Sequence, residues 1–160
     1  MIVIAEKEEL ELVEKLGFKD QPVLITGVGA INVIKALSKL PKDTPILNIG
    51  YCGSNNIEIG KTVGVCRVNT LHKTAQFNED SLSCFLCGSA ERYDEILPCY
   101  TSTDFVTKTH IKEPCVFDME LAYICSMFNF VMAIKVVSDN LSKKEYDKCK
   151  KSITSRKPKK

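Results

Sequence analysis

The sequence predicts an α/β fold in which helices flank a mixed, mostly parallel central sheet. Short apolar runs rich in β-branched residues recur between Gly or Pro residues, as is typical of strands that are buried on both faces. Segments with helical periodicity lie between these runs. With 160 residues, of which 44% are hydrophobic and 26% charged, the chain has the size and composition of one globular domain.

The expected strands and helices alternate along the chain. The apolar runs that predict strands are MIVIA, PVLITGVG, PILNIGY, KTVGVCRV and FVMAIKVVSD. Helices are predicted by apolar stripes at helical spacing, which consist of Leu10, Val13 and Leu16 before Gly17, of Ile31, Ile34, Leu37 and Leu40 before Pro41, and of Leu121, Ile124, Cys125 and Phe128. In such a fold the active-site groups lie at the carboxyl ends of strands.

Composition and charge argue against several classes of protein. No apolar run approaches the roughly 20 residues that cross a bilayer, and the acidic residues after MIVIA do not fit a secretion signal, so we expect a cytoplasmic protein without a membrane partner. A net charge of +2 gives no general reason to bind nucleic acid. Basic residues gather in KSITSRKPKK, where a nucleic-acid arm is the alternative to a solvated tail. We assign residues 1–145 to the domain and 146–160 to a basic tail.

The sequence contains eight cysteines, mostly inside apolar runs, where free cysteine behaves as a small buried hydrophobe. Cys84 and Cys87 form one CxxC pair, which leaves a redox or zinc site as a remote alternative. A second ligand pair is missing, and His72 and His110 stand alone in the sequence. We therefore expect no metal and no cofactor.

Carboxylates and glycine turns alternate at the expected strand ends, as a pocket for a small polar ligand would need. Asp139 follows a buried strand, where desolvation would raise its pKa and suit it to general-acid catalysis, or where it would cap a helix. Glu120 would accept hydrogen bonds from sugar hydroxyls, or would only complement a helix dipole. The remaining strand ends carry Glu8 and Glu9, Gly27-Val28-Gly29, Gly50 to Ser54, and Asp104-Phe105.

The order of these motifs resembles that of the purine nucleoside phosphorylase/uridine phosphorylase superfamily, and most closely its 5'-methylthioadenosine/S-adenosylhomocysteine nucleosidase branch. The matching segments are VLITGVGAINVIKAL, ILNIGYCGS, IGKTVGV, TSTDFV and VFDMELAYICSMFNFVMAIKVVSDN. They stand in family order and cover most of residues 1–140, and the pairing of DME with SDN is the most specific. The resemblance implies a nucleoside phosphorylase-like fold, here shortened.

The resemblance also implies catalytic roles. Asp139 would protonate N7 of the purine while the glycosidic bond breaks, and Ser138 would orient it. Glu9 falls where nucleosidases keep the Glu that activates water, with Glu8 as a competitor one residue away.

Substrate-binding roles follow in the same way. Glu120 would bind the ribose hydroxyls and Met119 would pack against the sugar. Phe105 would stack on the base, and the backbone of Val106 would contact its edge. The turn at the sugar and water site is formed by Tyr51, Cys52 and Gly53, in which Tyr51 would place a bulky ring.

Three activities fit this resemblance. We expect hydrolysis of an adenine nucleoside such as 5'-methylthioadenosine or S-adenosylhomocysteine. Phosphorolysis is the alternative, although no arginine precedes Arg67 and related phosphorylases hold phosphate with arginines before and near their glycine turns. The third possibility is a degenerate member that binds a nucleoside without cleaving it. Tyr51, Lys135 and Glu6 depart from the family pattern, residues 69–98 are abbreviated, and little follows Asn140.

Family resemblance finally implies a homodimer. A partner subunit often helps to close the 5' end of the pocket in this family, and Phe77 is a candidate for that role. Shortened peripheral elements would also leave apolar faces for a partner to cover.

Overall fold

The structure, a computed structural model, describes residues 1–71 and 81–154. Phe77 therefore lies outside the described residues. The strands are β1 (Ile2–Ile4), β2 (Val23–Ile25), β3 (Ile46–Ser54), β4 (Thr62–Leu71), β5 (Leu82–Ser83), β6 (Glu95–Ser102), β7 (Val116–Asp118) and β8 (Val131–Asp139). The helices are η1 (Lys7–Glu9), α1 (Leu10–Lys15), α2 (Ala30–Leu37), η2 (Ala90–Arg92), α3 (Leu121–Met127) and α4 (Lys143–Thr154).

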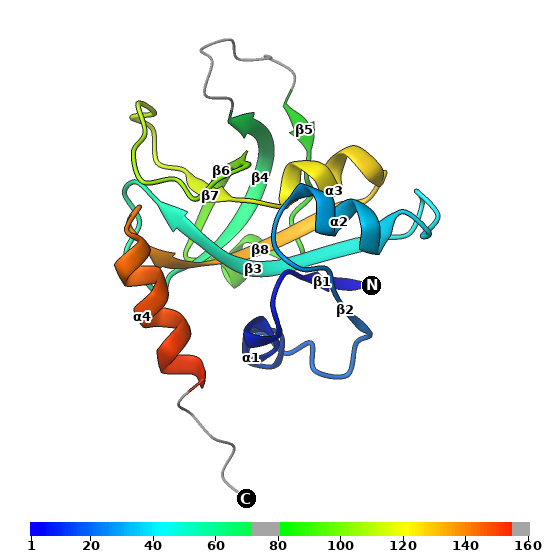
Figure 1. The fold of residues 1–160 in the computed structure, drawn as a ribbon. Coiled ribbons are helices and arrows are strands. Elements are labelled where there is room, and N and C mark those ends of the chain that lie inside the picture. The colour runs from blue at the N-terminus through cyan, green and yellow to red at the C-terminus, as the bar shows by residue number, and fades with distance from the viewer. Residues whose placement is uncertain (72–80, 155–160) are drawn as a thin grey trace, which may run out of the picture.

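The sheet closes on itself, which corrects the expectation of a mostly parallel central sheet. β8 pairs in parallel with β3 and antiparallel with β4. β6 pairs in parallel with β4 and β7, and β7 returns antiparallel to β3. β3, β8, β4, β6 and β7 thus form a mixed barrel, from which β1 and β2 extend in parallel beyond β3 (Figure 1). Apolar runs predict strands but not their direction, and register shifts in the long strands β3 and β4 provide the curvature for closure.

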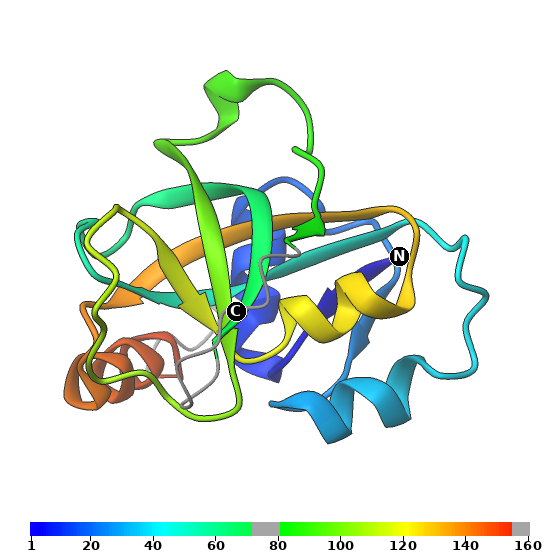
Figure 2. The ribbon, with the colours of Figure 1, turned by 90° about the horizontal axis from the view of Figure 1, so that it is seen from above.

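Helices cover both sides of the long strands (Figures 1 and 2). α2 and α3 pack side by side, and their inward side chains join a core with Val3, Ile46 and Val131. α1 packs Leu12 and Val13 against Ile4 and Ile49 on the other side. The strands alternate between these two cores because successive strand residues point to opposite faces.

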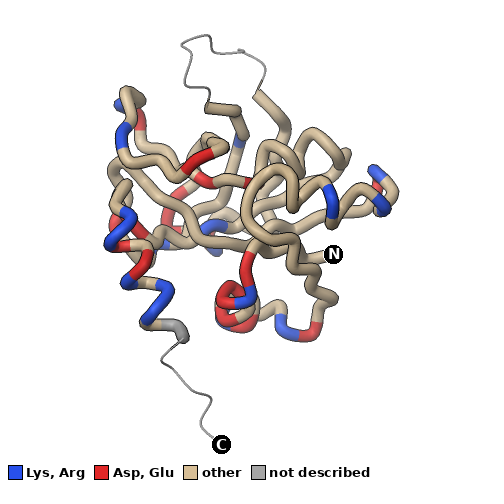
Figure 3. The backbone as a smooth tube through the Cα atoms, in the orientation of Figure 1, with Lys and Arg blue, Asp and Glu red and all other residues tan. Residues whose placement is uncertain are grey.

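Two expectations about helices need correction. In α2 the buried residues are Val33 and Leu37, whereas Ile31 and Ile34 are 67% and 48% exposed, so the expected stripe is turned partly outward. α4 covers residues 143–154 and crosses the domain boundary that the sequence suggests after residue 145. Lysines alternate with acidic residues along α4 (Figure 3), and this composition resembles a tail although the segment is helical. Within the described ranges no helix is long and apolar enough to span a bilayer.

Candidate active site

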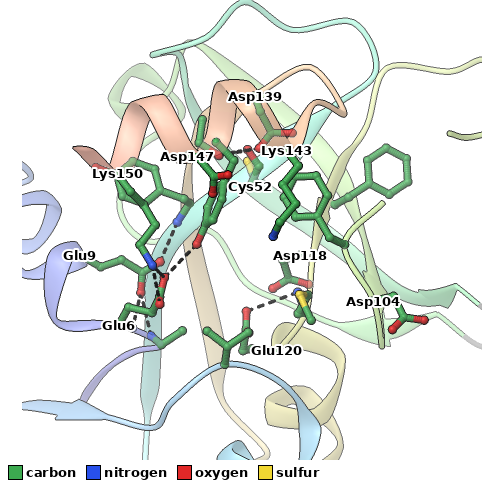
Figure 4. Close-up of a pocket in the computed structure, with 18 residues that line it drawn as sticks. Glu6, Glu9, Cys52, Asp104, Asp118, Glu120, Asp139, Lys143, Asp147 and Lys150 are labelled. Atoms are coloured by element: carbon green, nitrogen blue, oxygen red, sulfur yellow. Dashed lines mark hydrogen bonds and ion pairs between the residues drawn. The ribbon is translucent and has the colours of Figure 1, made fainter. Parts of the chain in front are cut away.

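A cavity of about 430 Å³ lies where the ends of β3, β7 and β8 meet η1 and α4 (Figure 4). A smaller hollow adjoins it and shares Phe105, Met119 and Asp139 with it. Every site residue expected from the sequence lines one of these two spaces. The cavity is lined by Glu9, Tyr51, Cys52, Phe105, Met119, Glu120, Ser138 and Asp139, and the hollow adds Gly53 and Val106.

Asp139 ends β8 and is 1% exposed. Its Oδ2 accepts a hydrogen bond from the Ser138 hydroxyl at 2.8 Å, and Ser138 Oγ lies 3.1 Å from the Cys52 carbonyl oxygen. Oδ1 is buried and accepts no hydrogen bond from any described residue. Burial raises the pKa of the Asp139 carboxyl, while the hydrogen bond from Ser138 and the backbone amides of Ser142 and Leu141 act against that shift. The outcome is a carboxyl group that favours its protonated form more than an exposed Asp does.

Gly53 gives Asp139 the room to approach β3. A Cβ atom at residue 53 would lie 3.0 Å from Asp139 Oδ1. Asn140 fixes the same junction, since its Nδ2 donates to the carbonyl oxygens of Ser54 and Ile57 at 3.2 and 2.8 Å. The SDN segment is therefore tied to the end of β3 on both sides of the carboxyl group.

Glu9 is 6% exposed and is held entirely by backbone amides. Its Oε2 accepts from the amides of Ala5 and Glu6 at 2.7 and 3.1 Å, and Oε1 accepts from the amide of Tyr51 at 2.9 Å. Burial raises the pKa of Glu9, and the amides act against that shift. Its competitor Glu8 is only partly buried and is absent from the cavity lining, so the geometry favours Glu9.

Gly50 allows Glu9 to reach β3. A Cβ atom at residue 50 would lie 2.8 Å from Glu9 Oε1, a distance that real Cβ contacts do not show. The glycine in ILNIGYC is therefore needed for close approach rather than for a tight turn, since it lies inside β3.

Glu120 occupies the N-cap position of α3 and lies across the cavity from α4 (Figure 4). Its Oε1 accepts from the Gly29 amide at 2.9 Å and its Oε2 from the Met119 amide at 3.3 Å. Burial, with Asp118 nearby, raises the pKa of Glu120 to about 7. The positive φ of 87° at Gly29 turns that amide toward the carboxylate.

A buried ion pair supports this junction, and its acidic member was assigned no site role from the sequence. Lys135 Nζ lies 2.8 Å from Asp118 Oδ2, and both side chains are at most 1% exposed. Asp118 also accepts from Thr101 Oγ1 at 2.6 Å and from the Leu121 amide at 2.9 Å. Burial acts to lower the pKa of Lys135, but Asp118, Cys99 and Glu120 together raise it well above its ordinary value, so the ammonium stays charged. Lys135 therefore provides a positive charge that favours the ionised form of Glu120.

The hollow at the other end of the cavity has an aromatic wall. Phe105 lies 5.5 Å from the Tyr146 ring, and Lys143 Nζ lies 5.4 Å from the Phe105 ring centre. Val106 and Gly53 complete the hollow. Aromatic and apolar walls beside Asp139 suit a flat heterocycle that receives a proton at its edge.

Tyr51 lines the cavity and is only partly buried. It also packs against the core that contains Leu12 and Val13 of α1. Burial raises the pKa of its hydroxyl, and Cys149 and Glu11 are the next contributors. Cys52, the next residue of β3, is buried in the opposite core and also lines the cavity.

One wall of the cavity was missed by the sequence analysis. α4 contributes Lys143, Tyr146, Asp147 and Lys150, which lie at helical spacing on one face. That spacing is visible in KKEYDKCK, but the high charge of the segment favoured a tail. Glu6, noted in the sequence as a departure from the family pattern, precedes η1 and lines the same wall. Among the described residues no group of three or more His, Cys, Asp or Glu side chains could hold a metal ion.

Comparison with solved structures identifies the fold. A 5'-methylthioadenosine/S-adenosylhomocysteine nucleosidase from Streptococcus pneumoniae superposes with a TM-score of 0.71 and 17% identity over 96% of this chain and 94% of that chain. The corresponding nucleosidase from Chlamydia trachomatis gives 0.70 and 19% over 95% and 87%. The enzyme from Helicobacter pylori gives 0.67 and 13% over 95% and 91%. The chain has the nucleosidase fold.

The resemblance read from the sequence is thus confirmed at the level of the fold. No protein-family model and no curated protein sequence matches the chain. The roles of individual residues therefore rest on the geometry of this site.

Proposed function

We propose that this protein hydrolyses the N-glycosidic bond of an adenine nucleoside, giving free adenine and the ribose derivative. The observation that carries this proposal is the Asp139 carboxyl group, which is buried, is held through one oxygen by Ser138 and lies at the aromatic hollow with its other oxygen unpartnered. Solved structures with this fold contain bound 5'-methylthioadenosine, adenine or 8-aminoadenine, which supports an adenine nucleoside as the substrate class.

The reaction needs a proton at the base and negative charge around the sugar. As the bond between C1' and N9 breaks, its electron pair moves into the purine, and the Asp139 proton neutralises the ring at N7. The sugar becomes an oxocarbenium ion, which the carboxylates of Glu120 and Glu9 stabilise. Water then adds to C1' and gives its proton to Glu9. Both carboxylates line the same cavity as Asp139.

The groups around the cavity favour water over phosphate as the nucleophile. Its described lining contains no arginine, and its lysines are Lys143 and Lys150. Lys150 is engaged by Glu6 at 2.7 Å, and Lys143 lies over Phe105 at the base end. The third basic side chain nearby, Lys135, is paired with Asp118. Phosphate would therefore face Glu6 and Glu9 without a bidentate partner.

We also propose that the enzyme acts as a cytoplasmic homodimer. Ile25, Val28, Ile31 and Ile34 expose 38% to 67% of their surface between the end of β2 and α2. A second copy would cover this apolar surface. Val28 also lines the cavity, so a partner there would adjoin the open side of the site.

Adenine release from 5'-methylthioadenosine, S-adenosylhomocysteine and adenosine, each with and without phosphate, tests the proposal. Hydrolysis predicts free adenine at equal rates in both conditions, measured by chromatography. Adenine that appears only with phosphate would establish phosphorolysis. Ligand-induced thermal stabilisation without adenine from any nucleoside would indicate a binding protein.

A further inference from the structure

The cavity ends in a charged cluster that the proposed reaction does not use. Glu6 Oε1 lies 2.7 Å and Oε2 2.9 Å from Lys150 Nζ. Oε2 also accepts from the Tyr146 hydroxyl at 2.8 Å. Asp147, one residue further along α4, lines the same wall. Glu6 and Lys150 lie at the end of the cavity opposite Asp104, beside Glu9 (Figure 4).

This location corresponds to the 5' side of the substrate, an assignment that rests on the proposed function. With the purine at Asp139 and Phe105 and the ribose hydroxyls at Glu120, the lining left over is Glu6, Tyr146, Asp147 and Lys150, with Ala5 and Val28. The 5' substituent leaves the ribose on the side away from the base. It must therefore lie against the charged cluster.

An apolar substituent fits this wall poorly. The side chains of Glu6 and Lys150 are 26% and 29% exposed, so both charges still contact water in the open cavity. A methylthio group would displace that water and offer no hydrogen bond in return.

The signs of the charges in this cluster indicate which kind of polar 5' substituent fits the wall. α4 and Glu6 together present two acids, Glu6 and Asp147, and two bases, Lys143 and Lys150, to the cavity. A phosphate at the 5' position would meet both acids and Glu9. A zwitterion matches both signs, because its ammonium pairs with a carboxylate while its own carboxylate pairs with a lysine.

We propose that the cluster of Glu6, Tyr146, Asp147 and Lys150 selects nucleosides whose 5' substituent ends in an amino acid. The substrate's ammonium lies against Glu6 and Asp147, and its carboxylate lies against Lys150. When the ligand binds, part of the ion pair between Glu6 and Lys150 is replaced by ion pairs with the ligand. The hydrogen bond from the Tyr146 hydroxyl keeps the Glu6 carboxylate in place.

Binding of uncleaved ligands tests this selection separately from catalysis. Isothermal titration of Asp139→Asn protein with S-adenosylhomocysteine, 5'-methylthioadenosine and adenosine should give about 10-fold tighter binding for the amino-acid ligand, as one good charge-assisted contact provides. Lys150→Met in the same background should remove that preference. Lys148→Met is the matched control, since Lys148 is exposed on the same helix and does not line the cavity.

Turnover by the protein with Asp139 intact provides the second readout. The ratio of kcat/KM for S-adenosylhomocysteine to that for 5'-methylthioadenosine should exceed one and should fall about 10-fold in Lys150→Met but not in Lys148→Met. Equal or tighter binding of 5'-methylthioadenosine or adenosine would overturn the proposed selection. Absence of adenine release together with tight binding of the amino-acid ligand would instead refute the catalytic proposal and leave the selection supported.

Discussion

Asp139 and Glu120 are both buried carboxyl groups, but their partners differ. Asp139 receives one side-chain hydrogen bond at Oδ2 and none at Oδ1, whereas Glu120 receives a backbone amide at each oxygen. Burial raises the pKa of both carboxyl groups, and backbone amides act against that shift in each, from Ser142 and Leu141 at Asp139 and from Gly29 at Glu120. Their places in the cavity separate their tasks: Asp139 lines the aromatic hollow with Oδ1 unpartnered, which suits proton donation to a base, whereas Glu120 lines only the larger cavity, where it can accept from sugar hydroxyls.

The raised pKa of Glu120 predicts a pH-dependent KM. Since that pKa is about 7, Glu120 is mostly protonated at pH 6 and mostly ionised at pH 8. The ionised form accepts from both ribose hydroxyls, so KM should fall as pH rises through 7, by up to about 10-fold. Initial rates measured at several substrate concentrations between pH 6 and pH 8 give KM and kcat separately. The pH dependence of kcat reports the protonation of Asp139, whereas that of KM reports Glu120.

Glu120→Gln gives the control for this prediction. The amide cannot ionise, so its KM should be high and should not change between pH 6 and pH 8. A KM that changes equally in both proteins would assign the titration to another group.

At the scale of elements, the junction of β7, α3 and β8 depends on one buried ion pair. Lys135→Met would leave Asp118 buried without its cation and should lower the free energy of unfolding by about 3–5 kcal/mol. Lys61→Met is a matched control, because the pair between Lys61 and Asp94 is 3.4 Å long and exposed and should contribute at most about 1 kcal/mol. Urea unfolding of both variants measures the difference, and similar losses would contradict the role given to Lys135.

The elements that sequence could and could not predict differ in physical character. β3, β4 and β8 are long apolar runs and were expected. β6 contains Pro98 and polar residues and β7 is only three residues long, so neither has a clear signal. α4 is stabilised by docking on β8 and η1 rather than by an apolar stripe of its own, and its helical spacing was hidden by its charge.

The residues of the candidate site also differ in whether the sequence could predict them. Asp139, Ser138, Glu120 and Glu9 follow strands or helix starts, where the strand-end rule applies, and the structure brings them together. Glu6 and Lys150 are far apart in the sequence and meet only because α4 folds back over η1. A pairing of this kind depends on tertiary structure and leaves no local pattern.

At the scale of the whole molecule, the exposed face of α2 predicts a dimer. Ile31→Glu combined with Ile34→Glu should convert a dimer into a monomer, because each change places a charge in an apolar interface. Ile59→Glu is the control, since Ile59 is also exposed, at 43%, but lies between β3 and β4. Sedimentation velocity gives the masses, and a wild-type monomer would contradict the prediction.

The closed barrel explains how one short chain can hold so many buried charges at the same place. β3 and β8 end together at the cavity, and β7 delivers Asp118 and Glu120 to the same edge. Closure fixes these strand ends relative to one another, so the carboxyl groups keep their separation.

The most direct test of the catalytic account is adenine release by Asp139→Asn compared with the unaltered protein, using S-adenosylhomocysteine and 5'-methylthioadenosine. An asparagine keeps the hydrogen bond with Ser138 but carries no acidic proton, so kcat should fall by about 100-fold or more. Binding of free adenine, measured by calorimetry, should be retained within about 10-fold because the aromatic hollow is unchanged. Adenine release at an unaltered rate would contradict the account, since Asp139 could not then be the proton donor.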